Sequence, residues 1–384
     1  MSPSKDLAGR RWLVLASAMV SFFAIGMTFF AVPPLVGTLR GLFALSNLEI
    51  GLLMGAIAVP AIVLSVPLGA ALDRWPPRAA GLAALGVMLV GAVVFAVAPS
   101  YLALLAGRLL FGAGGLLMNL LLARLLTAAF AGRELALAMG LFTGTYPASM
   151  IVLFSLHPVL AAQLGWRGEL GLLALLVLAA VPLHLLAVPG GRPTVAAAAP
   201  ADAPALPAPL VALGVAWMLY FAAFAAVPTF APEWAGGGAS GLLVTSVVTW
   251  VALVGTPLAG AAIDRTGRPE RWVTLGVVVL AAALGLMSAG AVPAVAAMAA
   301  VGLVAAVVPP AVYSLPARLV PAARVGFAFG FVTALSNLGA VLGPAVAGAI
   351  RDATDGWTAT WCALAAIAVG AAVAAALVRP PRTG

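Results

Sequence analysis

One arginine stands inside a long apolar stretch of the chain. Arg108 is the only charged residue between positions 101 and 123. Its guanidinium carries five donors in a rigid, always charged fork that matches a carboxylate or a phosphate. A charge in apolar surroundings costs about 2.5–3.5 kcal/mol on membrane-insertion scales, so it normally faces a cavity or a partner. Arg108 is therefore predicted to bind an anion, and the alternative is a structural arginine paired to helix carbonyls.

Two Asp-Arg pairs end other apolar stretches, one in each half of the chain. They lie 191 positions apart, and a further arginine follows each pair. A carboxylate at a helix end can pair with arginines and cap the N-terminus of a neighbouring helix. We expect a latch that holds one conformation and opens in another, and the alternative is a plain basic anchor at a membrane surface. The expected latch residues are Asp73, Arg74, Arg78, Asp264, Arg265 and Arg268.

Other kinds of chemistry lack the residues they need. The chain has one cysteine, Cys362, and its two histidines, His157 and His184, are far apart in sequence. This excludes a thiol-based metal site, and we expect the histidines to be tolerated or interfacial rather than to relay protons. The single lysine, Lys5, is not part of a P-loop, and no nucleophile–base cluster lies within the apolar stretches. We predict no enzymatic activity, no cofactor and no metal.

The composition indicates that the chain lies in a membrane. The 384 residues are 64% hydrophobic and 8% charged, whereas soluble domains are about 25% charged. The apolar runs last about 20 residues, the length of a helix that crosses a bilayer core about 30 Å thick. We predict an all-α membrane protein with twelve spans, near 12–36, 50–72, 79–98, 101–123, 135–157, 170–188, 210–231, 241–263, 272–290, 293–316, 325–350 and 357–378.

The chain divides into two similar halves. An Ala/Pro-rich stretch between the sixth and seventh spans has the composition of a linker. Short matches recur across it, such as Gly165-Trp166 and Gly356-Trp357, again 191 positions apart. We predict an N-terminal six-helix bundle at 1–188, a cytoplasmic linker at 189–209 and a C-terminal bundle at 210–384, related as parallel repeats.

The basic residues predict the orientation. With the N-terminus in the cytoplasm, the opposite side carries only Arg40, Arg167 and Arg351, and every other basic residue except Arg108 falls on the cytoplasmic side. Short cytoplasmic loops carry the excess of Lys and Arg in membrane proteins. Both termini are therefore predicted to be cytoplasmic, in the cell (inner) membrane. The net charge of +8 is scattered between spans and is not a nucleic-acid footprint.

Two motifs resemble the major facilitator superfamily. Gly260-Ala261-Ala262-Ile263-Asp264-Arg265-Thr266-Gly267-Arg268 is similar to its signature loop, and residues 69–78 form a second copy in which Pro76 replaces the glycine. Arg108-Leu109-Leu110-Phe111-Gly112-Ala113-Gly114 resembles its fourth-helix motif, with Phe111 in place of Gln. The resemblance implies a secondary transporter that works by alternating access. In this family the arginine is linked to proton coupling or anion binding.

The resemblance also implies where a substrate binds. Spans one, four, seven and ten line the central cavity in this family, and the Pro309-Pro310 pair is expected to interrupt the tenth span. Packing between helices is an equal alternative for each polar residue there. The candidate substrate-binding residues are Ser21, Thr28, Arg108, Asn119, Trp217, Tyr220 and Tyr313.

The substrate class follows from the charges. None of the 11 acidic residues lies deep in a predicted span, so a cationic substrate would find no counter-ion. We predict transport of a small organic solute, with an organic anion favoured. An exporter of drugs or other amphipathic compounds and a channel are the alternatives. A co-transported proton or other ion is left open, and the expected partners are the substrate and membrane lipid around a monomer, without nucleic acid.

Overall fold

The computed structural model describes residues 9–72, 74–130, 134–190, 206–321 and 324–378, and these form helices without a strand. Eleven helical stretches are long and apolar enough to cross a membrane. One of them, Leu137–Ala187, has 51 residues, about 76 Å of helix and more than twice a bilayer core. Its backbone breaks at Gly165 (φ 65°, ψ 173°), so it consists of two successive spans. The described residues thus contain twelve spans, as predicted.

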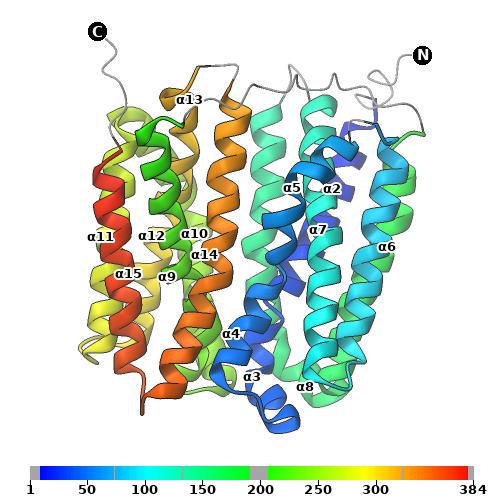
Figure 1. The fold of residues 1–384 in the computed structure, drawn as a ribbon. Coiled ribbons are helices and arrows are strands. Elements are labelled where there is room, and N and C mark those ends of the chain that lie inside the picture. Colours follow the sequence, from blue (N-terminus) through cyan, green and yellow to red (C-terminus); the bar gives the residue numbers. More distant parts are fainter. Residues whose placement is uncertain (1–8, 73, 131–133, 191–205, 322–323, 379–384) are drawn as a thin grey trace. The chain divides into compact units, whose positions relative to one another are not determined.

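Figure 1 shows the order of the helices along the chain. In order they are α2 (Arg11–Phe29), α3 (Val32–Phe43), α4 (Asn47–Ala56), α5 (Val59–Leu72), α6 (Pro77–Ala96), α7 (Tyr101–Ala129), α8 (Leu135–Ala187), α9 (Ala208–Trp234), α10 (Gly238–Thr266), α11 (Pro269–Ser288), α12 (Ala294–Ser314), α13 (Pro316–Leu319), α14 (Val325–Ala353) and α15 (Thr358–Ala376).

Proline interrupts two of the spans, whereas others, such as α9 and α12, continue through their prolines. The first span breaks between α2 and α3, where Pro33 is among the first residues of the new helix, and the second breaks between α4 and α5 just before Pro60. Proline lacks an N–H and is tolerated in a first helical turn. The expected interruption at Pro309-Pro310 is wrong, because α12 runs through both prolines to Ser314.

The chain packs as two compact units. One comprises Met1–Ala44 with Ala56–Ala198, and the other Leu45–Gly55 with Ala199–Gly384. The division into a bundle at 1–188, a linker at 189–209 and a bundle at 210–384 stays a prediction, and most of that linker, residues 191–205, lies outside the described residues.

In the first unit, glycine brings α6 and α7 together (Figure 1). A Cβ built on Gly91 would lie 2.3 Å from the amide nitrogen of Phe111, and one built on Gly107 would lie 2.6 Å from that of Phe95. Only a residue without a side chain allows this approach, which is a common way for membrane helices to associate. The close packing sets Arg108, the neighbour of Gly107, against α6.

In the second unit, α14 packs along α9 in the same manner. A Cβ on Gly339 would lie 2.0 Å from the carbonyl oxygen of Met218, and one on Gly343 would lie 1.9 Å from that of Ala222. The C-terminal end of α14 contacts the start of α4, which belongs to the same unit. The carboxylate of Asp352 accepts hydrogen bonds from the backbone N–H groups of Asn47 and Leu48, each at 2.8 Å. A carboxylate at a helix N-terminus satisfies N–H groups that have no partner within the helix.

Candidate functional site

Arg108 is fully buried in the first third of α7 and contacts the end of α2. Its guanidinium donates to the carbonyl of Thr28, and from both Nη1 (3.4 Å) and Nη2 (3.3 Å) to the carbonyl of Phe29. In an unbroken helix the carbonyl of Phe29 would accept from residue 33, but Pro33 has no N–H. The proline break therefore creates an acceptor, and Arg108 uses it.

Two aromatic residues, Phe95 and Tyr146, lie near this arginine. Its guanidinium carbon lies 5.8 Å from the ring centroid of Phe95, within the range of a cation–π contact. Tyr146 of α8 lies within electrostatic range of Arg108 and packs 5.8 Å from the ring of Phe29. We name Arg108, Thr28, Phe29, Phe95 and Tyr146 the Arg108 centre. The carbonyls, rings and hydroxyl described around the guanidinium carry no formal charge.

The other candidates of the first unit lie apart from Arg108. The hydroxyl of Thr28 donates to the carbonyl of Ala24 (3.0 Å), so Thr28 meets Arg108 through its backbone. Ser21 is buried two turns before Thr28, and its hydroxyl has no hydrogen-bond partner among the described residues. Asn119 is exposed and lies about 16 Å along α7 from Arg108, at 1.5 Å per residue. The structure brings Thr28 to Arg108 and not Asn119 or Ser21.

The second unit brings its three candidates together. The rings of Trp217 and Tyr220 of α9 are stacked with centroids 4.9 Å apart, and Tyr313 of α12 meets Trp217 edge-on at 5.8 Å. Trp217 and Tyr220 are each 1% exposed, whereas Tyr313 is 45% exposed. Three phenylalanines, which the sequence did not single out, complete what we name the aromatic cluster: Trp217, Tyr220, Phe221, Phe224, Tyr313 and Phe329.

Comparison with known proteins identifies the family. The family model described as Major Facilitator Superfamily matches residues 14–239 and 210–384. The chain belongs to this superfamily. A human relative, Monocarboxylate transporter 11, is 30% identical over 344 residues, which are 80% of this chain and 70% of that protein.

Solved structures of major facilitator proteins share the fold. A variant of the nucleoside transporter NupG superposes with a TM-score of 0.78 at 16% identity, covering 95% of this chain and 99% of that one. A bacterial homolog of the human lysosomal transporter Spinster gives 0.77 at 15% identity, covering 96% of both chains. The protein is therefore an integral membrane transporter of the major facilitator class and not an enzyme.

The two signature loops of this major facilitator protein differ in backbone. Gly267 ends α10 in the left-handed region (φ 64°), which the ring of Pro76 at the related place forbids. In both halves, however, an arginine reaches back to the loop region: Arg124 donates to the carbonyl of Gly69 (3.1 Å), and Arg318 to that of Gly267 (2.8 Å). These two arginines are 194 positions apart, so they are related by the internal repeat.

The latch of the sequence analysis stays a prediction. Asp73 lies outside the described residues, Arg74 is exposed and Arg78 is half-buried. In the second copy, Asp264, Arg265 and Arg268 are exposed, and no ion pair joins them to one another within the described ranges.

One polar pair was missed by the sequence analysis. Nδ1 of His157 lies 2.9 Å from both carboxylate oxygens of Glu169, and Glu169 is 2% exposed. The two residues flank the break at Gly165, which folds the end of one span against the start of the next. The two residues are twelve positions apart, and no sequence pattern indicated that they are in contact. In the part of the chain that the structure describes, no group of three His, Cys, Asp or Glu could hold a metal ion.

Proposed function

We propose that this transporter moves a small organic anion, specifically a monocarboxylate, across the membrane by alternating access. The observation that carries the proposal is Arg108, a guanidinium fully buried inside a span, where it donates to the carbonyls of Thr28 and Phe29 and lies near the ring of Phe95. Carbonyl oxygens and rings solvate a cation without carrying a formal charge themselves. A carboxylate adds a full opposite charge and bidentate geometry in a medium of low dielectric.

The relative named Monocarboxylate transporter 11 supports the same substrate class. Its similarity extends over 80% of this chain. We propose that this transporter, too, takes a substrate with one carboxylate.

The aromatic cluster, taken within its own unit, is suited to binding apolar groups. Tyr313 presents 45% of its surface, and behind it Trp217 is buried with an Nε1–H that has no partner among the described residues. Aromatic faces bind apolar groups, and a Trp N–H or Tyr O–H serves as a polar handle. The same uncharged cluster favours the second candidate function, export of amphipathic compounds. Each group is testable by itself, because each lies within one unit.

Further parts of the proposal concern topology and coupling. We propose an inner-membrane monomer with both termini cytoplasmic, and a proton or another ion as the coupling partner. A reporter fused after residue 382 should read cytoplasmic, and one inserted between 235 and 238 should read external. The reverse readings would overturn the orientation.

The deciding experiment uses the purified protein in proteoliposomes. A panel of labelled monocarboxylates, amino acids, nucleosides and lipophilic dyes is tested for uptake, with and without a pH gradient. We expect saturable monocarboxylate uptake that accelerates when unlabelled substrate is loaded inside. Flux that neither saturates nor shows this counterflow would indicate a channel, and transport of dyes alone would favour the exporter.

A further inference from the structure

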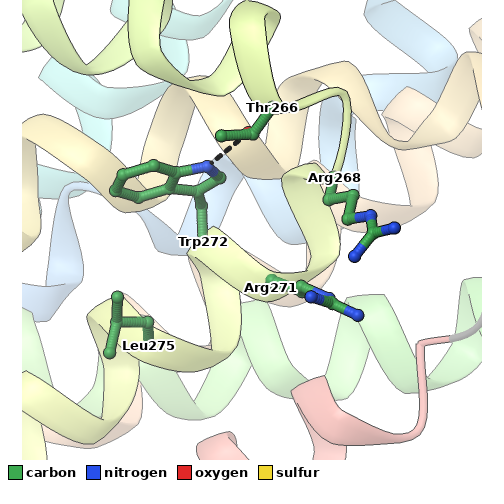
Figure 2. A pocket seen from close by; sticks show the side chains of 5 residues that line it. All are labelled: Thr266, Arg268, Arg271, Trp272 and Leu275. Atoms are coloured by element: carbon green, nitrogen blue, oxygen red, sulfur yellow. Dashed lines mark hydrogen bonds between the residues drawn. The ribbon is translucent and has the colours of Figure 1, made fainter.

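A basic pocket lies where α10 turns into α11, within the second unit. It has a volume of about 450 Å³ and is lined by Thr266, Arg268, Arg271, Trp272 and Leu275. Figure 2 shows Arg268 and Arg271 toward one side of the view, with the indole of Trp272 and the side chain of Leu275 toward the other. The transport proposal uses neither Trp272 nor Arg271.

The turn that forms the pocket is held by specific hydrogen bonds. Nε1 of Trp272 donates to the hydroxyl of Thr266 (2.8 Å), which in turn donates to the carbonyl of Ile263 (3.0 Å). Arg318 donates to the carbonyl of Gly267 at 2.8 Å and so fixes the turn from α13. The indole is therefore held in place by its one polar group, and its ring is left as an apolar wall (Figure 2).

The lining carries positive charge without a carboxylate. Arg268 and Arg271 are both exposed, and their guanidiniums form no ion pair or hydrogen bond within the described ranges. The acids nearest in sequence, Asp264 and Glu270, do not line the pocket. Two adjacent guanidiniums repel each other, and an anion between them removes that repulsion and gains charge-assisted hydrogen bonds.

An apolar stripe leads away from the pocket along α11. Leu275, Val278 and Leu286 are 56%, 48% and 45% exposed. They follow Arg271 by four, seven and fifteen residues, so all lie on one face of the helix. In a membrane protein such a face contacts acyl chains, and the pocket lies at its polar end. Arginine beside tryptophan at that level is the usual composition of a membrane interface.

We propose that this pocket binds the phosphate of an anionic phospholipid. Arg268 and Arg271 hold the phosphate, Trp272 packs against the glycerol region, and one acyl chain runs over Leu275 and Val278. Basic pockets at the ends of membrane helices recognise such headgroups. Inorganic phosphate has the same charge chemistry but nothing to place on Trp272 and Leu275. The occupant is therefore a lipid rather than a free ion.

The test measures lipid binding by the purified full chain. Wild type in detergent is titrated with phosphatidylglycerol, with phosphatidylcholine and with inorganic phosphate, and bound lipid is counted by native mass spectrometry alongside the unfolding midpoint. We expect phosphatidylglycerol to bind and raise the midpoint. The double variant Arg268→Gln/Arg271→Gln should bind it at least about tenfold more weakly, since it loses more than 1.4 kcal/mol of charge-assisted bonding.

Two further variants keep the proposal falsifiable. Arg265→Gln removes a neighbouring exposed arginine that does not line the pocket, and it should bind lipid as wild type does. Leu275→Asn should weaken phosphatidylglycerol while leaving any phosphate effect unchanged. Equal binding by the double variant and wild type would overturn the site. Protection by inorganic phosphate as strong as that by phosphatidylglycerol would overturn the lipid as its occupant.

Discussion

The Arg108 centre and the aromatic cluster occupy related spans of the two halves but differ in charge. Under the 194-residue offset that relates Arg124 to Arg318, the position corresponding to Arg108 is Gly302. That glycine is packed: a Cβ there would lie 2.6 Å from the carbonyl oxygen of Val248. One half therefore encloses a guanidinium, while the other closes the same position and presents rings instead.

Proline sharpens this comparison. Pro33 and Pro228 follow valines at matching places in the repeat, yet α2 breaks before Pro33 whereas α9 runs through Pro228 as one helix. The fold therefore accommodates this proline without an arginine at the position related to Arg108. The carbonyls near Pro33 explain how Arg108 is solvated in the first unit. They do not explain why the chain has a charge at this position. The proposed anionic substrate would give this charge a role.

The largest effect is expected in the aromatic cluster. Trp217→Ala should lower the free energy of unfolding by about 3–5 kcal/mol, because it leaves a cavity among Tyr220, Phe221 and Tyr313. Chemical unfolding in mixed micelles measures this change. Trp250→Ala, at a tryptophan that is 52% exposed, is the control and should change little. Equal losses in both variants would mean that the cluster is not a packed core.

A smaller loss of stability is expected at Gly302, the packed position that corresponds to Arg108. Gly302→Leu should destabilise by about 1–3 kcal/mol, because its side chain would collide with α10. Gly285→Leu on α11 is the matched control, since a Cβ there meets nothing within 4 Å. Comparison of the two thermal midpoints checks the claim. Gly302→Leu as stable as its control would remove the contrast between the two halves.

The number of spans could be predicted from the sequence, because it follows from the lengths of the hydrophobic runs. The distribution of positive charge predicts their orientation. Arg108 was recognisable as a charge within a span. Its neighbour Tyr146 was not, because no local pattern says which spans pack together. The interruption predicted at Pro309-Pro310 was wrong, since neighbouring groups can satisfy the carbonyls that proline frees within a membrane. No acidic residue was expected deep in a span, and the burial of Glu169 against His157 depends on the break at Gly165.

The smallest effect is expected at the exposed edge of the aromatic cluster. Tyr313→Leu should lower the free energy of unfolding by only about 0.5–1.5 kcal/mol, because the ring is 45% exposed and loses mainly its edge-on and stacked contacts. If this ring contacts the apolar body of the substrate, KM rises by up to about tenfold while kcat changes less. Tyr101→Leu, outside the cluster, is the control. An unchanged KM for every transported monocarboxylate would remove Tyr313 from the binding site.

The most direct test of the account is monocarboxylate binding by Arg108 variants in purified form. Arg108→Gln should bind about 10–100-fold more weakly than wild type, because a hydrogen bond to a charged group contributes about 1.5–3 kcal/mol, and Arg108→Lys should fall between the two. Arg167→Gln is the matched control: Arg167 also donates to a backbone carbonyl, that of Ala98 (3.4 Å), and lies 4.4 Å from an aromatic centroid, but near a helix break. Calorimetric titration of each variant, after its fold is checked by size exclusion, gives the affinities. Wild-type affinity in Arg108→Gln would contradict the account and make this arginine a structural one.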